Sequence, residues 1–358
     1  MKQVQVGLGE RSYPILIENG VMAGIGKDIK ARGIAKRFMV ITDSTVAELY
    51  GKAVLASLAQ AGFSAELIPF PAGEASKTLA TVANLASRLA QAGLDRKDGL
   101  IALGGGVTGD ITGFLASSYM RGVPFVQIPT TLLAQVDSSV GGKTGVDIPE
   151  GKNLVGAFYQ PRAVYIDSLA LRSLPKAELL NGIAEVIKYG VIYDHDFFVF
   201  LEEQRSAILA LDLPVLERVI ETCCAIKAKV VAADEREADL RRILNYGHTI
   251  GHAVEADSGY QLAHGSAVAI GMVAANRLAV AKGLFPAGEA ARVEALIDGF
   301  GLPTSIPAAA NRERLKGYLL TDKKTVAGRP FFVLPTAIGR VEITADVDEA
   351  LIDQVLTV

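Results

Sequence analysis

Three histidines lie close together in this chain, and their spacing predicts a metal centre. His248 and His252 are four residues apart on one expected helix, so both imidazoles can face a single metal ion. His264 follows after a short turn and can return to the same place. Glu185 is the carboxylate candidate, because a charge among apolar helix residues is costly when it is unpaired. The alternative is a set of hydrogen-bonded core histidines without a metal.

A glycine turn is the second feature that indicates chemistry. In LIALGGGVTGD, residues 100–110, an apolar run expected to be a strand ends in glycines and leads into a helix that begins near Asp110. Free backbone N–H groups and the positive end of the helix dipole at such a turn suit a pyrophosphate. The spacing matches neither the Rossmann fingerprint nor a Walker lysine loop. Tight packing without a ligand is the alternative.

Two more strand ends are expected to line the same dinucleotide crevice. They are AGEASK, residues 72–77, and PTT, residues 129–131. Asp43 follows a further strand and is placed either to accept a ribose hydroxyl or to cap the next helix. The sequence leaves both roles of Asp43 open.

Cationic and amide side chains gather in a glycine-rich stretch, residues 137–153. This stretch contains Asp137, Lys143, Lys152 and Asn153. Confined cations suit a phosphate ester or a carboxylate, whereas the alternative is a solvated surface loop. Four more polar residues fall on helices expected to approach the histidines: Lys188, Lys227, Arg241 and Asn245. So many cations near one site predict an anionic substrate with more than one charged end.

The elements that position these residues change in kind along the chain. Up to about residue 172, β-rich runs alternate with amphipathic helical segments, which is typical of a parallel α/β sheet. Helical periods dominate from residue 173, and a short β pair returns at 329–336 and 339–345. We therefore expect an α/β dinucleotide-binding domain over residues 1–172. A mainly α-helical metal- and substrate-binding domain is expected over residues 173–358.

Composition narrows the class of protein. The chain has 358 residues, half of them hydrophobic and 21% charged, which is a globular balance. Its net charge of −3 gives no bulk attraction to nucleic acid or to an acidic membrane. Neither a signal peptide nor a membrane-spanning run is apparent, so a cytoplasmic protein is expected. Cys223 and Cys224 are adjacent on an expected helix and are interpreted as packing thiols rather than a redox pair.

Eight blocks of sequence, in this order and at these separations, resemble the 3-dehydroquinate synthase family over essentially the whole chain. They are GGGVTGD, YMRG, QIPTTLLAQVDSSVGGKTGVD, GKNLVGAFYQP, AEVIKYG, LNYGHTIGHAVE, HGSAVAIGM and DKK. The resemblance implies a homodimer that binds NAD and a divalent metal, zinc or alternatively cobalt. It also implies conversion of 3-deoxy-D-arabino-heptulosonate 7-phosphate to 3-dehydroquinate and phosphate in the shikimate pathway. Transient oxidation at C5, phosphate elimination, re-reduction and an intramolecular aldol closure make up that reaction.

The resemblance also implies roles for individual residues. The metal ligands are Glu185, His248 and His264, and His252 lies beside the substrate phosphate instead of on the metal. Substrate is held by Asp137, Lys143, Asn153, Lys188, Lys227, Arg241, Asn245 and Lys324, and by Arg121 from across a dimer interface. Together with the glycine turn, the NAD-binding residues are Asp43, Gly73, Glu74, Lys77, Gly105, Gly106, Val107, Gly109, Asp110, Thr130, Thr131, Lys143 and Lys152.

Two positions depart from the commoner family residues, namely Thr108 and Ser266. Neither has an expected catalytic role, so the departures concern details at the edge of the substrate site. Other sugar phosphate cyclases and metal-dependent polyol dehydrogenases are the rival functions on the same plan. A polyol dehydrogenase would release NADH and would not need so many cations. A non-catalytic NAD-binding sensor would have no reason to keep the ligands and the cations together.

Overall fold

The structure is a computed structural model that describes residues 1–321, 325–326 and 329–356. The chain divides into two compact units. The first contains Met1–Leu174 and Leu216–Arg236, and the second contains Pro175–Val215 and the chain from Glu237 onward. Within the described ranges, no helix is both long and apolar enough to cross a membrane.

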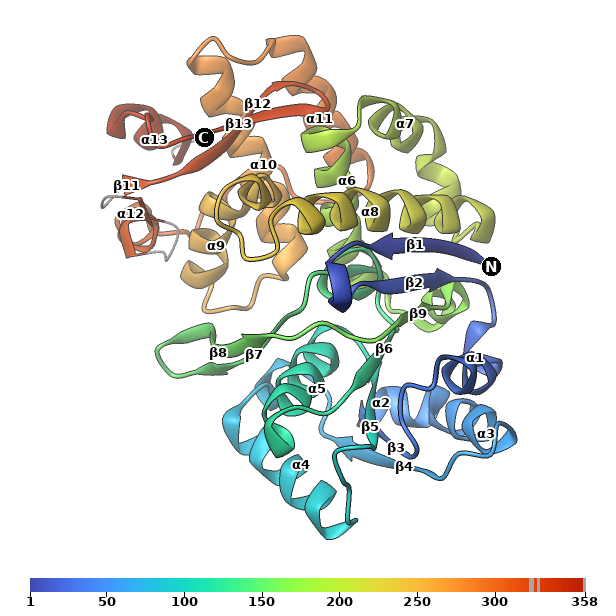
Figure 1. Ribbon diagram of the computed structural model, residues 1–358. Helices are drawn as coiled ribbons and strands as arrows, with labels where there is room; N and C mark the ends of the chain where they lie inside the picture. Colours follow the sequence, from blue (N-terminus) through green and yellow to red (C-terminus); the bar gives the residue numbers. More distant parts are fainter. Residues whose placement is uncertain (322–324, 327–328, 357–358) are drawn as a thin grey trace. The chain divides into compact units, whose positions relative to one another are not determined.

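The first unit contains a seven-stranded sheet in the part of the chain described, with the order β1-β2-β9-β6-β5-β3-β4 (Figure 1). β1 pairs antiparallel with β2, and the other neighbours pair in parallel. The strands are β1 (Lys2–Val6), β2 (Tyr13–Ile17), β3 (Phe38–Asp43), β4 (Ala65–Phe70), β5 (Gly99–Gly104), β6 (Phe125–Pro129) and β9 (Val164–Ile166). The expected α/β class of this region is confirmed.

Helices cover both faces of this sheet. They are α1 (Ile25–Arg32), α2 (Ser44–Val46), α3 (Lys52–Gln60), α4 (Leu79–Gln91) and α5 (Gly106–Ser118). In β3, Phe38 and Val40 pack into the core shared with α1 and α3, whereas Met39 and Ile41 pack into the core shared with α4 and α5 (Figure 1). Every residue of β2, β5 and β6 is buried, as expected for a parallel sheet that is covered on both faces.

The glycine-rich stretch forms an antiparallel hairpin instead of a loop. Its strands are β7 (Lys143–Ile148) and β8 (Gly151–Phe158). A Cβ atom at Gly145 would lie 2.7 Å from the Val155 carbonyl oxygen, and one at Gly156 would collide with the Thr144 carbonyl. These glycines therefore allow two backbones to approach closely. Composition alone could not separate that role from the confined loop that was expected.

Helix α8 (Leu213–Ala233) brings a late segment of the chain back to the first unit. Lys2 Nζ forms an ion pair with Glu221 at 2.7 Å, and the Cys224 thiol donates to the Gln135 carbonyl at 3.3 Å. A single domain boundary at residue 172 leaves out this return of α8 to the first unit. An amphipathic sequence pattern predicts a helix, but it does not reveal which hydrophobic core the helix joins. Cys223 and Cys224 are both buried and free, and burial raises the pKa of the Cys224 thiol to about 12. Inert packing thiols fit this environment.

The second unit is mainly helical, as expected. Its helices are α6 (Lys176–Tyr193), α7 (His195–Leu209), α9 (His248–Asp257), α10 (His264–Ala281), α11 (Ala287–Gly299), α12 (Arg312–Thr321) and α13 (Glu349–Leu356). The short β pair expected near the end is present, because β12 (Phe332–Ala337) pairs antiparallel with β13 (Arg340–Thr344). The first two residues of the expected run form a separate strand, β11 (Arg329–Pro330), which pairs with β10 (Thr325–Val326).

Glycines let α10 pack very closely against α6 and α9. A Cβ atom at Gly251 would lie 2.8 Å from the Ala267 carbonyl oxygen. One at Gly271 would collide with the Gly247 carbonyl, and one at Gly265 with the backbone of Asn181. The first turns of α9 and α10, which carry two of the expected metal ligands, are therefore held by backbone-to-backbone contact.

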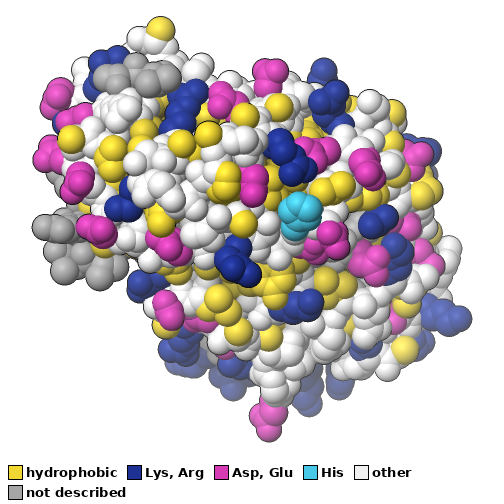
Figure 2. Space-filling view, turned by 90° about the horizontal axis from the view of Figure 1, so that it is seen from above, with side chains coloured by type: hydrophobic (Ala, Val, Ile, Leu, Met, Phe, Trp, Pro, Cys, Tyr) yellow, Lys and Arg dark blue, Asp and Glu magenta, His cyan; other side chains and the backbone are white. Residues whose placement is uncertain are grey.

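The surface carries both signs of charge. On the face drawn in Figure 2, Lys and Arg side chains are interspersed with Asp and Glu side chains. The mixture of signs on this face is consistent with the small net charge of −3.

The close contact between α9 and α10 predicts the effect of one added methyl group. Gly271→Ala should lower the free energy of unfolding by about 1–3 kcal/mol, because the obstacle is backbone and cannot rotate away. Thermal denaturation followed by circular dichroism measures this change. Gly288→Ala on α11 is the matched control, since its Cβ meets nothing within 4 Å, and it should raise stability by about 0.5–1 kcal/mol. Equal stability of the two variants would contradict the packing argument.

Candidate active site

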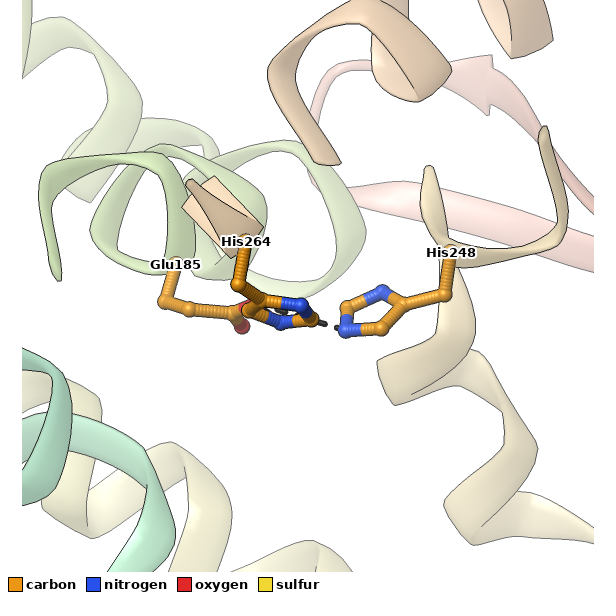
Figure 3. A group of neighbouring side chains, drawn as sticks. All are labelled: Glu185, His248 and His264. Carbon is orange, nitrogen blue, oxygen red and sulfur yellow. Dashed lines mark ion pairs between the residues drawn. The ribbon is translucent and has the colours of Figure 1, made fainter. Parts of the chain in front are cut away.

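The three expected metal ligands converge in the second unit (Figure 3). Glu185 comes from α6, and His248 and His264 are the first residues of α9 and α10. Their donor atoms all lie within 4.8 Å of one another. The distance to Glu185 Oε1 is 3.3 Å from His248 Nε2 and 3.6 Å from His264 Nε2. Two imidazole nitrogens and one carboxylate form a donor set that is typical of a catalytic zinc site.

Glu185 is charged although it is almost completely buried, with 1% of its side chain exposed. Burial by itself would raise its pKa, but the nearby Lys188 ammonium and the His248 imidazole outweigh burial and hold the pKa well below its usual range. Lys188 pairs with it from one helical turn away. In the described structure, neither buried carboxylate oxygen accepts a hydrogen bond of regular geometry. The carboxylate oxygens of Glu185 therefore keep lone pairs that can bind a cation, and the three candidate ligands fit a divalent metal.

Each ligand histidine is oriented by a partner on its other ring nitrogen. His248 Nδ1 lies 3.1 Å from the Tyr246 carbonyl oxygen, and His264 Nδ1 lies 3.2 Å from Glu255 Oε2. Burial alone would lower the pKa of His264, but the carboxylates of Glu185 and Glu255 raise it to about 9. Sequence reasoning missed Glu255. The available signal was its position three residues after His252, on the helix that carries two histidines.

The third histidine of the cluster has a different set of neighbours. The His252 ring centroid lies 5.3 Å from that of His248 and 5.8 Å from that of His264. Its donor atom groups with those of Glu255 and His264, whereas the donor set of Glu185 contains His248 and His264. The expected clustering of three histidines is therefore present. The role of His252 beside a substrate phosphate stays a prediction.

The other expected substrate-binding residues of the second unit sit near the same helices. Lys188 and Arg241 are both buried, the latter in the short 3-10 helix η8 (Leu240–Asn245). Asn245 Nδ2 donates to Glu237 Oε1 at 2.6 Å. Ser266, a departure from the family pattern, is half-buried on α10. Lys324 lies outside the described residues.

The first unit carries a separate group of expected substrate-binding residues. The Lys227 ammonium, on α8, lies 2.8 Å from Asp137 Oδ1 and also donates to the Asp137 carbonyl at 2.6 Å. Lys143 is exposed at the start of β7, and the backbone N–H of Asn153 donates to Asp147 Oδ1 at 2.7 Å. Arg121 is exposed at the end of the 3-10 helix η5 (Tyr119–Arg121).

The glycine turn has the open backbone that a pyrophosphate requires. β5 ends at Gly104 and α5 begins at Gly106. Gly105, which lies between them, has no side chain that could cap the N-terminus of α5. A Cβ atom would lie 3.0 Å from Thr131 Cγ2 if added at Gly105, and 3.2 Å from Ser138 Oγ if added at Gly106. The turn therefore has little room for a side chain at either position, and no side chain caps the N-terminus of α5, so the turn fits a phosphate group.

Several other expected cofactor residues have partners within the first unit. Asp43 Oδ1 accepts from the backbone N–H groups of Thr45 and Val46, both at 3.0 Å, so Asp43 does cap α2. The Lys77 ammonium pairs with Asp110 at 2.6 Å. Other contacts are Thr131 Oγ1 with the Ala134 N–H at 3.1 Å and Lys152 Nζ with Glu74 Oε1 at 3.9 Å, while Thr130 and Thr108 are buried. A ribose contact for Asp43 is neither required nor excluded by the cap.

Comparison with known proteins agrees with this geometry. Residues 67–181 match the family described as 3-dehydroquinate synthase N-terminal, and residues 182–325 match 3-dehydroquinate synthase C-terminal. The chain is 51% identical over 358 residues to "3-dehydroquinate synthase" of Desulforamulus reducens, which covers 100% of both chains.

Two solved structures share the whole fold. One is 2-deoxy-scyllo-inosose synthase complexed with carbaglucose-6-phosphate, NAD+ and Co2+, with a TM-score of 0.90, 28% identity and 99% of each chain covered. The other is 2-epi-5-epi-valiolone synthase from Streptomyces hygroscopicus with NAD+ and Zn2+ bound, with a TM-score of 0.90 and 29% identity. That match covers 98% of this chain and 97% of the other.

The donor sets predict which variants lose metal. Glu185→Ala and His264→Ala should each lose most bound zinc, because each removes a ligand from the set that contains His248. His252→Ala should retain zinc, since His252 is outside that set. Elemental analysis of the purified proteins measures the metal content. Equal loss of zinc in the His252 variant would make His252 a ligand after all.

The glycine turn predicts a defect in dinucleotide binding. Gly106→Val should weaken NAD binding, because the branched side chain occupies the approach to the α5 N-terminus. Titration calorimetry with NAD measures the dissociation constant, and Gly288→Ala serves again as the control. An unchanged dissociation constant in a folded Gly106→Val protein would remove the turn from the cofactor site.

Proposed function

Because this chain belongs to the 3-dehydroquinate synthase family, we propose that it converts 3-deoxy-D-arabino-heptulosonate 7-phosphate to 3-dehydroquinate and inorganic phosphate. The observation that carries the proposal is the 51% identity to a relative of that name over all 358 residues. In this proposal the enzyme is a phosphate-eliminating carbon–oxygen lyase that depends on NAD and a divalent metal. C5 of the substrate is oxidised and later reduced within one cycle, so the net redox change is zero.

Glu185, His248 and His264 are proposed to hold the metal. When bound, a divalent cation supplies Lewis acidity, which lowers the pKa of a substrate alcohol. Two histidines and one carboxylate are a donor set that would suit a catalytic rather than a purely structural metal. The chain contributes a buried carboxylate that stays ionised beside Lys188, and two imidazoles whose Nε2 atoms face that carboxylate. The support for this assignment is the short mutual distance of the donor atoms.

The glycine turn and the strand ends around it are proposed to hold the dinucleotide. When bound, NAD supplies a hydride acceptor for the substrate C5 and returns the hydride in the same cycle. The chain contributes open backbone N–H groups at Gly105 and Gly106 and the positive end of α5. Lys77 stays paired with Asp110 next to this helix, which keeps a buried ammonium compensated.

The cationic and amide side chains are proposed to hold the phosphate and carboxylate of the substrate. They are Arg121, Lys143, Asn153, Lys188, Lys227, Arg241, Asn245, His252 and Lys324, and the Asp137 carboxylate is proposed to hold another part of the substrate. Fixing a substrate in reactive geometry lowers a barrier by up to about 7–11 kcal/mol in ideal cases. The departing phosphate can accept the proton from C6 itself, so this assignment demands no side-chain general base.

Three further parts of the proposal concern organisation. We predict a homodimer in which Arg121 reaches the partner's substrate. A cytoplasmic location and a functional division near residue 172 also stay predictions. The exposed position of Arg121 is compatible with the first of these.

Another sugar phosphate cyclase activity is the second candidate. It is supported by the full-length structural match to 2-deoxy-scyllo-inosose synthase and 2-epi-5-epi-valiolone synthase. Identity to the curated 3-dehydroquinate synthase is much higher, which favours the first candidate.

Phosphate release without accumulation of NADH is the decisive expectation. The purified protein, supplied with zinc and a substoichiometric amount of NAD, should release many equivalents of phosphate from the heptulosonate phosphate. A coupled phosphate assay and the near-ultraviolet absorbance of NADH are followed together. Phosphate release from other sugar phosphates alone would favour the second candidate. Stoichiometric NADH formed from simple polyols would replace both candidates with a dehydrogenase.

A further inference from the structure

The two ligand histidines are oriented by chemically different partners. The Tyr246 carbonyl faces Nδ1 of His248, and the Glu255 carboxylate faces Nδ1 of His264. A backbone carbonyl is neutral and is present whatever the side chain. A carboxylate adds negative charge and depends on one residue. Removing the Glu255 side chain would therefore take away the Nδ1 partner of His264 while leaving all three donor residues in place.

Glu255 is itself held rigidly at the end of α9. Its side chain is 7% exposed, and its backbone carbonyl accepts from Ser258 Oγ at 2.7 Å and from the Tyr260 N–H at 3.0 Å. Two residues later, Asp257 accepts from Arg314 Nε at 2.6 Å, which ties the same helix end to α12. A buried carboxylate on a fixed backbone can select one orientation of the ring that it faces.

The orientation of the His264 ring matters because only one of its two nitrogens can point toward the other metal ligands. His264 Nε2 lies 3.6 Å from Glu185 Oε1, on the side of the ring opposite the nitrogen that faces Glu255. If Nδ1 donates its proton to Glu255, then Nε2 carries the lone pair that a metal needs. Rotation of the ring would exchange these two nitrogens and spoil the donor set.

We propose that Glu255 is a positioning residue that accepts the Nδ1 proton of His264 and so directs Nε2 into the Glu185–His248–His264 donor set. The inference rests on the proposed metal site. Partners of this kind typically contribute about 10- to 100-fold to metal affinity. The ligand residues themselves do not change in this role, so the effect is on affinity and geometry rather than on the presence of ligands.

The test compares Glu255→Ala and Glu255→Gln in the full-length protein. Zinc affinity is measured by competition with a chromophoric chelator, and ligand geometry by the visible absorption of the Co2+-substituted protein. Glu255→Ala should lose about 10- to 100-fold in zinc affinity and show an altered Co2+ spectrum. Glu255→Gln keeps an acceptor oxygen at the same reach but loses the charge, so it should retain the parental spectrum with a smaller loss of affinity. If the alanine variant does not fold, the glutamine variant alone must still lose affinity.

Glu294→Gln is the matched control, because Glu294 pairs with Arg277 from the partly exposed surface of α11. It should match the parent in affinity and spectrum. Parental zinc affinity and spectrum in Glu255→Ala, with zinc lost in His264→Ala, would overturn the positioning role and keep the metal site. Unchanged affinity in His264→Ala would instead overturn the metal site itself. A second zinc ion that is bound by the parent and by Glu294→Gln but lost in both Glu255 variants would make Glu255 a ligand, which also overturns the positioning role.

Discussion

The buried carboxylate of Glu185 is the constraint on which the second unit depends. An ionised carboxylate that is 1% exposed is very costly unless compensating groups surround it, and here the Lys188 ammonium and the His248 and His264 imidazoles do so. These partners come from three helices, so the helices must be held in a fixed mutual rotation. A shift of one residue along α6 would turn Glu185 away by about 100°. The buried charge of Glu185 therefore requires this arrangement of the helices, and the packing of the helices in turn places the compensating groups around Glu185.

Close backbone packing provides that fixed rotation. Gly251 against Ala267 places the first turns of α9 and α10 directly beside each other, and Gly265 against Asn181 places the first turn of α10 beside α6. Both ligand histidines occupy first helical positions, where the helix dipole disfavours positive charge. Two carboxylates more than offset this effect at His264, because its pKa is raised to about 9. Small residues thus set the geometry, and acidic residues set the electrostatics.

Sequence reasoning reached the class of fold and the ligand candidates, but it missed features that depend on tertiary contact. The parallel sheet was predictable because runs such as residues 99–104 are apolar throughout. The hairpin at 143–158 was not, since Gly145 and Gly156 look the same in sequence whether they give flexibility or close approach. Likewise, the pattern of α8 predicts a helix but not the unit it joins. Glu185 could be identified from the sequence because it is a charged residue among the apolar residues of its helix. Glu255 does not contrast with its sequence neighbours in this way, so the sequence did not single it out.

The charges around the metal ligands bear on which substrate the site can bind. Glu185 and Glu255 together balance a divalent cation, so Lys188 leaves the proposed site with a net positive charge. That sign suits a substrate that carries both a phosphate and a carboxylate, whereas a neutral polyol would leave the net positive charge of the site unbalanced once water was excluded. The same buried lysine that keeps Glu185 ionised therefore also discriminates in favour of an anionic substrate. On this view, the preference for a phosphorylated acid is fixed within a few residues of the metal ligands.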